Sequence, residues 1–200
     1  MHPNPAFQHG SREAHEALID RVGFGMVFLT TPDGPRVAHT PLYSSGNGAV
    51  RFHIARGNAL ARHLDGAQAL VVINGPEAYV SARWYAEPDQ VSTWNYVALE
   101  MEGTVRAIDD DALAELLENL TDRHEARTKG GIPWTMDKLT PAYRQKLMRA
   151  IIGFEMSVTE WRGTTKLSQN KSQTERDRLI AGLEHQGASA MAELMRDHAE

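Results

Sequence analysis

Short apolar runs separated by tight turns fill the first part of the chain. Residues 26–29 read as a buried strand, and residues 36–43 and 49–55 read as two more. The segments between them, 32–35 and 45–48, are rich in Pro, Asp, Asn and Gly, which favour turns because proline presets φ and Asp-Gly tolerates positive φ. Three strands joined by tight turns predict a meander of antiparallel hairpins.

Strand patterns continue beyond residue 60. Further strands are expected at residues 68–74, 77–85, 94–108 and 152–161. The first two of these are expected to pair around Gly75-Pro76, and Gly103 marks a bulge or bend in the long third one. Strands and helices do not alternate strictly, so a doubly wound parallel sheet is not expected.

Apolar residues at helical spacing, together with capping residues, predict helices between and after the strands. Helices are expected to begin after Ser11, Asn58, Asp109 and Thr140, and at the capping box that starts with Ser172. Residues 127–139 read as a surface loop. The chain is therefore expected to be mainly β with peripheral helices (α+β), an antiparallel barrel forming one domain over residues 1–200 with a C-terminal helical extension at about 172–198.

Composition narrows the possible functions. The 200 residues contain no cysteine, which fits a reducing compartment and excludes thiol catalysis and cysteine metal ligation. The formal net charge is −5, so a duplex-DNA surface would require basic residues gathered on one face. No apolar run approaches the roughly 20 residues that span a bilayer, and the first ten residues lack an apolar signal core. We expect a cytoplasmic protein without a membrane partner.

Common catalytic and metal motifs are absent or incomplete. Gly23-Phe24-Gly25 follows a predicted helix and precedes a strand, whereas a dinucleotide fingerprint requires the reverse order. His15 and His124 are each followed by Glu but lack the second histidine that a zinc helix needs. We therefore expect no metal, and the sequence assigns no catalytic residue.

The segment Arg56-Gly57-Asn58 has the residue types that bind a phosphate monoester. Such a group carries roughly −1.5 to −2 charges near neutral pH, and it needs a cation, free backbone N–H groups and room to approach. Arg56, Gly57 and the predicted helix start at Asn58 would supply all three. The alternative is that Arg56 is a surface charge and Asn58 only a cap.

Two other groups of residues suit a flat heteroaromatic ligand. Trp94-Asn95-Tyr96 places an amide between two aromatic rings, and residues 166–170 add an ammonium, a hydroxyl and two amides just before a helix. Such a set can stack on a ring and hydrogen-bond its rim, although core aromatics are the alternative. His39 and His53 lie on neighbouring predicted strands, where they could line one pocket or belong to the barrel wall.

An ordered set of motifs resembles the PaiB family of FMN-binding split-barrel proteins, which are described as negative transcriptional regulators. The motifs are His39-Thr40-Pro41 within residues 36–42, residues 52–58, residues 75–81 with Trp84-Tyr85, residues 93–96, and residues 166–170 followed by Asp177-Arg178. Ser92 stands where the family usually has proline, and Lys171 where it often has arginine. These departures indicate a divergent member.

The resemblance implies a six-stranded split barrel related to pyridoxamine-phosphate oxidase, a homodimer, and FMN at the dimer interface. Arg56 and Asn58 would hold the phosphate with help from Lys166, and His53 would lie near the ribityl chain. The ring would contact Arg36, Val37, Ala38 and His39 along its edge, Trp94 and Asn95 of the partner chain, and Gln169 at its rim. A DNA or regulatory partner follows from the family alone.

Two other functions fit the same barrel. One is an FMN-dependent oxidoreductase, because the flavin itself carries hydride chemistry and the protein need only position a substrate. The other is a plain flavin or haem carrier. The sequence leaves these alternatives open.

Overall fold

The computed structural model describes residues 3–8 and 10–198, so both ends of the predicted domain lie outside the described residues. The chain divides into two compact units. Unit 1 contains the N-terminal segment through Ser11, residues 74–100 and the chain from Arg162 onwards, and unit 2 contains residues 12–73 and 101–161. Each unit is described on its own below.

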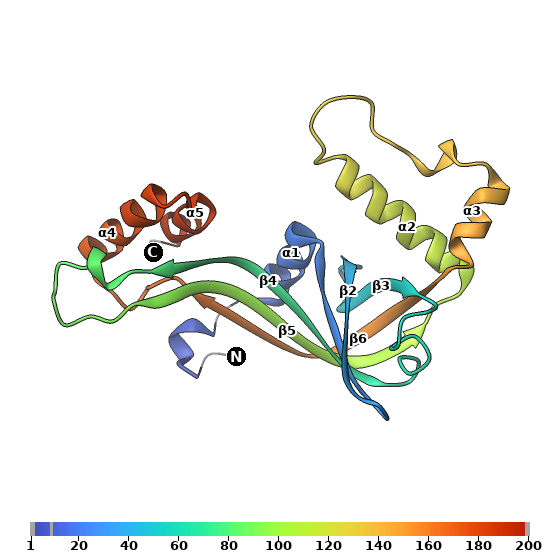
Figure 1. Cartoon of the computed structure of the whole chain (residues 1–200), viewed down its shortest axis with the longest axis horizontal. Coiled ribbons are helices and arrows are strands. Elements are labelled where there is room, and N and C mark those ends of the chain that lie inside the picture. Colours follow the sequence, from blue (N-terminus) through green and yellow to red (C-terminus); the bar gives the residue numbers. More distant parts are fainter. Residues whose placement is uncertain (1–2, 9, 199–200) are drawn as a thin grey trace. The chain divides into compact units, whose positions relative to one another are not determined.

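Six antiparallel strands form a closed barrel in the order β1-β2-β3-β6-β5-β4, which confirms the predicted fold class (Figure 1). The strands are β1 Phe24–Thr31, β2 Gly34–Ser44, β3 Ala49–Ala55, β4 Gln68–Val80, β5 Thr93–Ala107 and β6 Ile151–Lys166. The first three form the predicted hairpin meander. β3 closes it onto β6, where Phe52 pairs with Phe154.

The barrel core of unit 2 follows from the two-residue period of its strands. Val50, Phe52 and Ile54 alternate along β3 and are buried, while the residues between them face outward. Phe52 stacks on Phe154 with ring centroids 5.6 Å apart. Burying a side chain of this size stabilises a fold by roughly 1.5–3 kcal/mol. The side chains at the alternate positions of the same strands lie on the outer surface of the barrel, where they can contact other groups.

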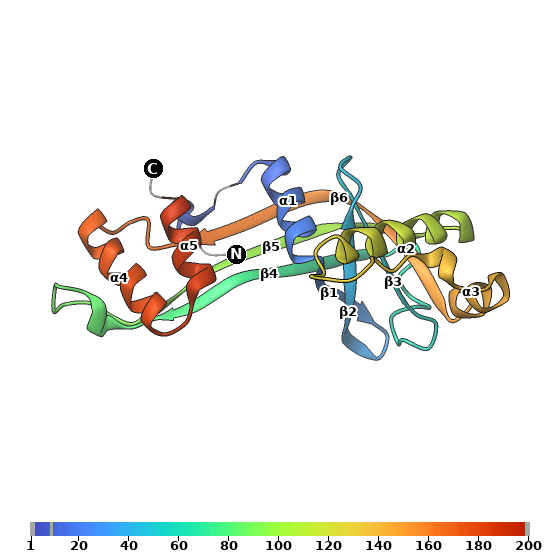
Figure 2. The same cartoon turned by 90° about the horizontal axis from the view of Figure 1, so that it is seen from above.

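Unit 2 also holds α1 (Arg12–Val22) and a long excursion between β5 and β6. The excursion consists of α2 (Asp110–Glu125), η3 (Met136–Lys138) and α3 (Pro141–Met148), and Figure 1 and Figure 2 show a helix, a loop and a shorter returning helix. Asp109 caps α2 by accepting a 2.8 Å hydrogen bond from the N–H of Ala112. The apolar side of α2 packs against Met148 through Leu113, Leu116 and Leu120.

The helical part of unit 1 is α4 (Gln173–His185) and α5 (Ser189–Asp197), which lie side by side in both views. Ser172 caps α4, as the capping box predicts. Arg176 is buried and ties the pair together, because its guanidinium donates to the carbonyls of Met195 at 2.6 Å and His198 at 3.1 Å. Unit 1 also contains the 3-10 turns η1 (Pro5–Phe7) and η2 (Ala82–Trp84).

Two element predictions are wrong in detail. β4 runs without a break through Gly75-Pro76, so residues 68–74 and 77–85 are not a strand pair, and residues 82–84 form η2. Residues 58–64 form consecutive turns and no regular helix. The C-terminal extension is two helices, since Gly187 adopts φ +78 between them.

None of the helices in the described part of the chain is long and apolar enough to cross a bilayer.

Candidate functional site

Unit 2 contains the loop predicted to bind phosphate, directly after β3. The Arg56 N–H donates to the carbonyl of Ala150 at 2.9 Å, and its Nε donates to the carbonyl of Arg149 at 2.8 Å. The side chain is exposed, and no carboxylate of the described residues forms an ion pair with it. A Cβ built on Gly57 would meet nothing within 4 Å. The loop therefore offers a cation beside open space.

Asn58 lies in a turn and not at the helix start that the sequence predicted. Its side-chain Oδ1 accepts from the Leu60 N–H at 3.0 Å, and its carbonyl accepts from the Ala61 N–H at 3.0 Å. These bonds close a local turn and do not open a helix. Since no helix begins here, a phosphate would gain no helix-dipole stabilisation, and Arg56 would carry the electrostatic attraction.

Arg149 is a second cation at this loop that the sequence analysis missed. It is the C-cap residue of α3, it is exposed, and its carbonyl is the acceptor for Arg56 Nε. Among the described residues it has no carboxylate in ion-pair contact. The only sequence signal was its place just before β6, whose Ile151 pairs with Ala55 of β3. That pairing brings residues 56 and 149 together.

His53 and His39 both face outward from the barrel of unit 2. His53 is half-buried, and its Nδ1 is a buried atom without a hydrogen-bond partner in the described structure. Burial lowers its pKa, because the imidazolium would lose hydration. The Thr40 hydroxyl donates to the His53 carbonyl at 2.5 Å, and His39, two positions from Pro41 along β2, is exposed. The two rings therefore share one face of neighbouring strands.

Residues 36–38 lie near the start of β2. Ala38 is only 3% exposed and points into the core, so only its backbone is available to a ligand. Val37 is 41% exposed and lies opposite Phe28 of β1. Arg36 lies at the rim and donates from Nη1 to the carbonyl of Pro35 at 2.9 Å.

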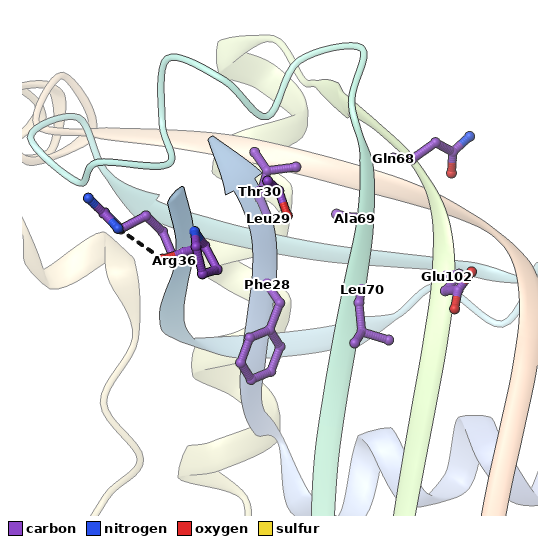
Figure 3. Close-up of a pocket in the computed structure, with 9 residues that line it drawn as sticks. Phe28, Leu29, Thr30, Arg36, Gln68, Ala69, Leu70 and Glu102 are labelled. Atoms are coloured by element: carbon purple, nitrogen blue, oxygen red, sulfur yellow. Dashed lines mark hydrogen bonds between the residues drawn. The ribbon is translucent and has the colours of Figure 1, made fainter. Parts of the chain in front are cut away.

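A cavity of about 380 Å³ in unit 2 includes Arg36 (Figure 3). Phe28 and Leu70 pair across β1 and β4 and form an apolar part of its wall. Gln68, which donates to Thr104 Oγ1 at 2.7 Å, and Glu102 add polar groups. The lining residues are Phe28, Leu29, Thr30, Pro35, Arg36, Gln68, Ala69, Leu70 and Glu102. An apolar wall with a few polar groups is typical of a small-molecule site.

Unit 1 carries the predicted aromatic residue Trp94 on its surface. Trp94 is 52% exposed and meets Tyr79 edge to face, with ring centroids 5.9 Å apart. Tyr79 belongs to the family motif at residues 75–81, but it was assigned no ligand role from the sequence, because it lies on β4 and only the strand pairing brings it to Trp94. Two exposed aromatic rings on one sheet surface can stack on a planar ligand.

Asn95 and Gln169, also in unit 1, are already bonded within the chain. Asn95 is fully buried; its Oδ1 accepts from Ser168 Oγ at 3.0 Å and its Nδ2 donates to Met195 Sδ at 3.3 Å. Gln169 Nε2 donates to the Thr165 carbonyl at 2.6 Å, while its Oε1 accepts from the Leu167 N–H at 2.7 Å. A direct flavin contact by either amide stays a prediction, and it would require these bonds to break.

Lys166 lies at the end of β6 in unit 1. Its Nζ donates to Thr93 Oγ1 at 2.5 Å, and burial lowers its pKa. The ammonium has no carboxylate partner among the described residues. It remains available to an anionic group.

Comparison with known proteins identifies the family. Residues 1–160 match the family described as "Putative FMN-binding domain". The chain is 33% identical over 187 residues to the Bacillus subtilis "Protease synthase and sporulation protein PAI 2", covering 90% of this chain and 89% of that protein. It is 30% identical over 202 residues to an uncharacterized Emericella nidulans protein, covering 83% and 80%.

Two solved structures share the fold. The FAD and heme binding protein from Mycobacterium smegmatis superposes with a TM-score of 0.62 at 21% identity, covering 85% of this chain and 78% of that one. The flavocytochrome Anf3 from Azotobacter vinelandii gives 0.64 at 15% identity, covering 88% and 78%. The chain therefore belongs to the FMN-binding split-barrel family that includes PAI 2, the PaiB family that its motifs predict.

Proposed function

We propose that this chain binds FMN on the outward face of β2 and β3, with the phosphate at Arg56. The observation that carries the proposal is the loop after β3, where Arg56 has no carboxylate partner among the described residues and Gly57 leaves open space. A charged hydrogen bond from a guanidinium to a phosphate oxygen is stronger than a neutral one. FMN is also the cofactor of the family to which the chain belongs.

The neighbouring groups fit the rest of the molecule. His53 Nδ1 is a buried polar atom that lacks a partner in the described chain, and a ribityl hydroxyl would satisfy it. The outward backbone and side chains of residues 36–39 would follow the ring edge. When bound, FMN supplies hydride and single-electron chemistry, and the protein supplies binding and orientation.

We also propose a homodimer in which unit 1 of the partner completes the site. Trp94 with Tyr79 would offer ring surfaces, and Lys166 would offer a cation. Two observations support this: Trp94 and Tyr79 are exposed to solvent, and Lys166 has no acidic partner among the described residues. Asn95 and Gln169 would shape this surface from beneath unless their internal bonds open.

A role in negative transcriptional regulation is proposed from family membership. FMN binding would shift the equilibrium between two conformations of the dimer surface, and a regulatory partner would bind one conformation better than the other. The named relative is a protease synthase and sporulation protein, which is consistent with a regulatory role.

The second candidate is an FMN-dependent oxidoreductase. The cavity beside Arg36 favours it, because a substrate could lie against Phe28 and Leu70 near the proposed ring position. Oxidation of NAD(P)H faster than by free FMN would support this candidate. A simple flavin or haem carrier is the third, and the absorption spectrum of the pure protein separates flavin from haem.

Titration with FMN and riboflavin tests the proposal. We expect FMN to bind more tightly, since riboflavin lacks the phosphate. Arg56→Ala should weaken FMN binding by about 1.5–3 kcal/mol, the range for a hydrogen bond to a charged group, and leave riboflavin binding unchanged. Failure of the wild-type protein to bind either flavin would refute the proposed function, and an equal loss for both flavins would remove Arg56 from the phosphate role.

A further inference from the structure

Exposed apolar side chains gather in the segment between α2 and the end of α3. Ile132 is 90% exposed, and Trp134, Tyr143 and Leu147 are exposed as well. These four are among the nine large apolar residues that the described part of the chain exposes, and they fall within sixteen positions. Single exposed apolar residues need no explanation, but a cluster marks an interaction surface.

The same segment is basic although the protein is acidic. Residues 127–147 contain five Lys or Arg and one Asp, a net charge of +4, whereas the whole chain carries −5, so the remaining residues carry −9. Arg144 forms an ion pair with Glu118 at 2.5 Å. The other four cations have no carboxylate in ion-pair contact within residues 3–8 and 10–198: Arg127, Lys129, Lys138 and Lys146.

The segment is anchored to α2 within unit 2. The Trp134 N–H donates to Glu125 Oε2 at 2.8 Å, and Lys138 Nζ donates to the Pro133 carbonyl at 3.1 Å. Met148 packs against the leucine cluster of α2. The loop and the returning helix (Figure 1) are therefore both held to α2.

One ring, one cation and one aliphatic side chain share the outward side of α3. Tyr143, Lys146 and Leu147 are three and four positions apart and lie on one side of the helix. Arg144 and Met148 occupy the side that contacts α2. The positive charge of Lys146 therefore lies on the same side of α3 as the exposed ring of Tyr143.

We propose that this basic–aromatic patch binds single-stranded nucleic acid. The patch consists of Arg127, Lys129, Ile132, Trp134, Lys138, Tyr143, Lys146 and Leu147. Unpaired bases stack on aromatic side chains, and lysines and arginines follow the phosphates. The four cations have no competing carboxylate, so phosphate contacts break no ion pair.

Two other partners fit the patch less well. Three of the four cations are lysines, and lysine is depleted in the cores of protein–protein interfaces. A helix that lies on an anionic membrane separates an apolar face from a charged face, whereas α3 mixes them and, at eight residues, is only about 12 Å long. Both partners are outcomes of the test.

Fluorescence anisotropy with a labelled single-stranded oligonucleotide tests the proposal on the full-length protein. We expect affinity to fall with salt, with a log–log slope of roughly −2 to −3 for four phosphate contacts on a single strand. Lys129→Ala with Lys146→Ala should reduce the slope by about 1.4. The matched control is Arg62→Ala with Arg106→Ala, which removes two exposed cations elsewhere in unit 2 and should leave the slope unchanged.

Stacking is tested at Trp134. Trp134→Leu keeps an apolar side chain without a flat ring and should weaken binding roughly five- to a hundredfold, whereas Trp134→Tyr should retain most of it. Thermal unfolding confirms that each variant is folded. No patch residue belongs to the proposed FMN site, so the patch variants should bind FMN as tightly as the wild-type protein does. FMN titration therefore tests the proposed function separately from this surface.

Several results would overturn the proposal. They are no binding of the oligonucleotide at low salt, tighter binding of a duplex of the same length, and unchanged binding by the patch variants. Two further results would reassign the surface. Patch-dependent binding to phosphatidylserine vesicles alone would assign it to lipid, and a patch-dependent change in mass by light scattering would assign it to a second copy.

Discussion

Among the described residues, the guanidinium of Arg56 has one hydrogen-bond partner, the carbonyl of Arg149 at the end of α3. This contact caps the helix, since a basic side chain can satisfy one of the last carbonyls. It also fixes the direction of the guanidinium, whose remaining nitrogens then point away from that bond. A structural role for Arg56 and a phosphate-binding role are therefore compatible. Loss of the first would affect the end of α3, whereas loss of the second would weaken the binding of FMN and not of riboflavin.

Arg149 should act as a second phosphate ligand under the proposed function. Two cations at one loop without an acidic partner among the described residues match the charge of a phosphate dianion. We expect Arg149→Ala to weaken FMN binding about 10-fold or more and to leave riboflavin binding unchanged. Lys146→Ala, which removes a cation from the same helix, is the control. FMN binding that depends on Arg56 but not on Arg149 would contradict this role and leave the proposed function standing.

His53 should make stability depend on pH. The ordinary histidine pKa is about 6.5, and burial lowers the pKa of His53 in the folded protein. Between the lowered pKa and 6.5 the unfolded chain binds more protons, so the free energy of unfolding rises with pH through that window and falls on acidification. Urea unfolding from about pH 5 to pH 7.5 measures the slope. His53→Gln should flatten it, and an unchanged slope would mean that another group is responsible.

The site residues show what sequence can and cannot predict at this scale. Arg56 and Trp94 were identified because a local motif surrounds each of them. Arg149 and Tyr79 were missed because their relevance comes from strand pairing with segments far along the chain. Asn95 has the residue type of a ligand donor, but only the tertiary structure shows that it bonds to Ser168 and Met195.

At the scale of elements, Gly103 illustrates why β5 needs a glycine. A Cβ at this position would lie 2.1 Å from the Ser157 carbonyl oxygen of β6. Gly103→Ala should therefore force the strands apart and destabilise the protein by about 1–3 kcal/mol. Gly57→Ala is the matched control, because no atom lies within 4 Å of its Cβ position and the effect should stay within about 0.5 kcal/mol. Urea unfolding of both variants distinguishes them, and equal stabilities would contradict the close approach.

Strands were predicted correctly where turn residues flank an apolar run on both sides. β3 was predicted at its observed limits because tight-turn residues precede it and Arg56-Gly57 follow it. β4 was divided in two because Gly75-Pro76 usually interrupts a strand, but glycine here permits close packing against Val97, whose Cβ would lie 3.1 Å from a Cβ at Gly75. The helix expected at Asn58 was replaced by turns because its side chain bonds to Leu60.

The hairpin meander predicted the order of the first three strands of the barrel, whereas the dimer stays a proposal. Closure of β3 onto β6 joins residues about a hundred positions apart, which no local pattern encodes. The family resemblance implied a six-stranded barrel, which the structure confirms, but it did not identify β6 as the partner of β3. The assembly state depends on surfaces that a single chain leaves exposed.

The outward face of β1 and β2 is the surface on which we expect the second copy to pack. Phe24 is 51% exposed there and Val37 is 41% exposed, and burial of both would remove apolar area from water. Light scattering should give twice the chain mass of 22.2 kDa for the wild-type protein. Phe24→Glu should give the monomer mass, since its carboxylate would lose hydration in the interface.

The affinity for FMN should fall when the dimer dissociates, because the proposed site contains residues of both copies. We expect the monomeric variant to lose affinity for FMN and riboflavin alike, which distinguishes it from the phosphate variants. Val91→Glu is the control: Val91 is 79% exposed in unit 1, and its substitution should leave both mass and affinity unchanged. A monomer that binds FMN as tightly as the wild-type protein would place the complete site within one chain, and the aromatic pair of unit 1 would then need another ligand.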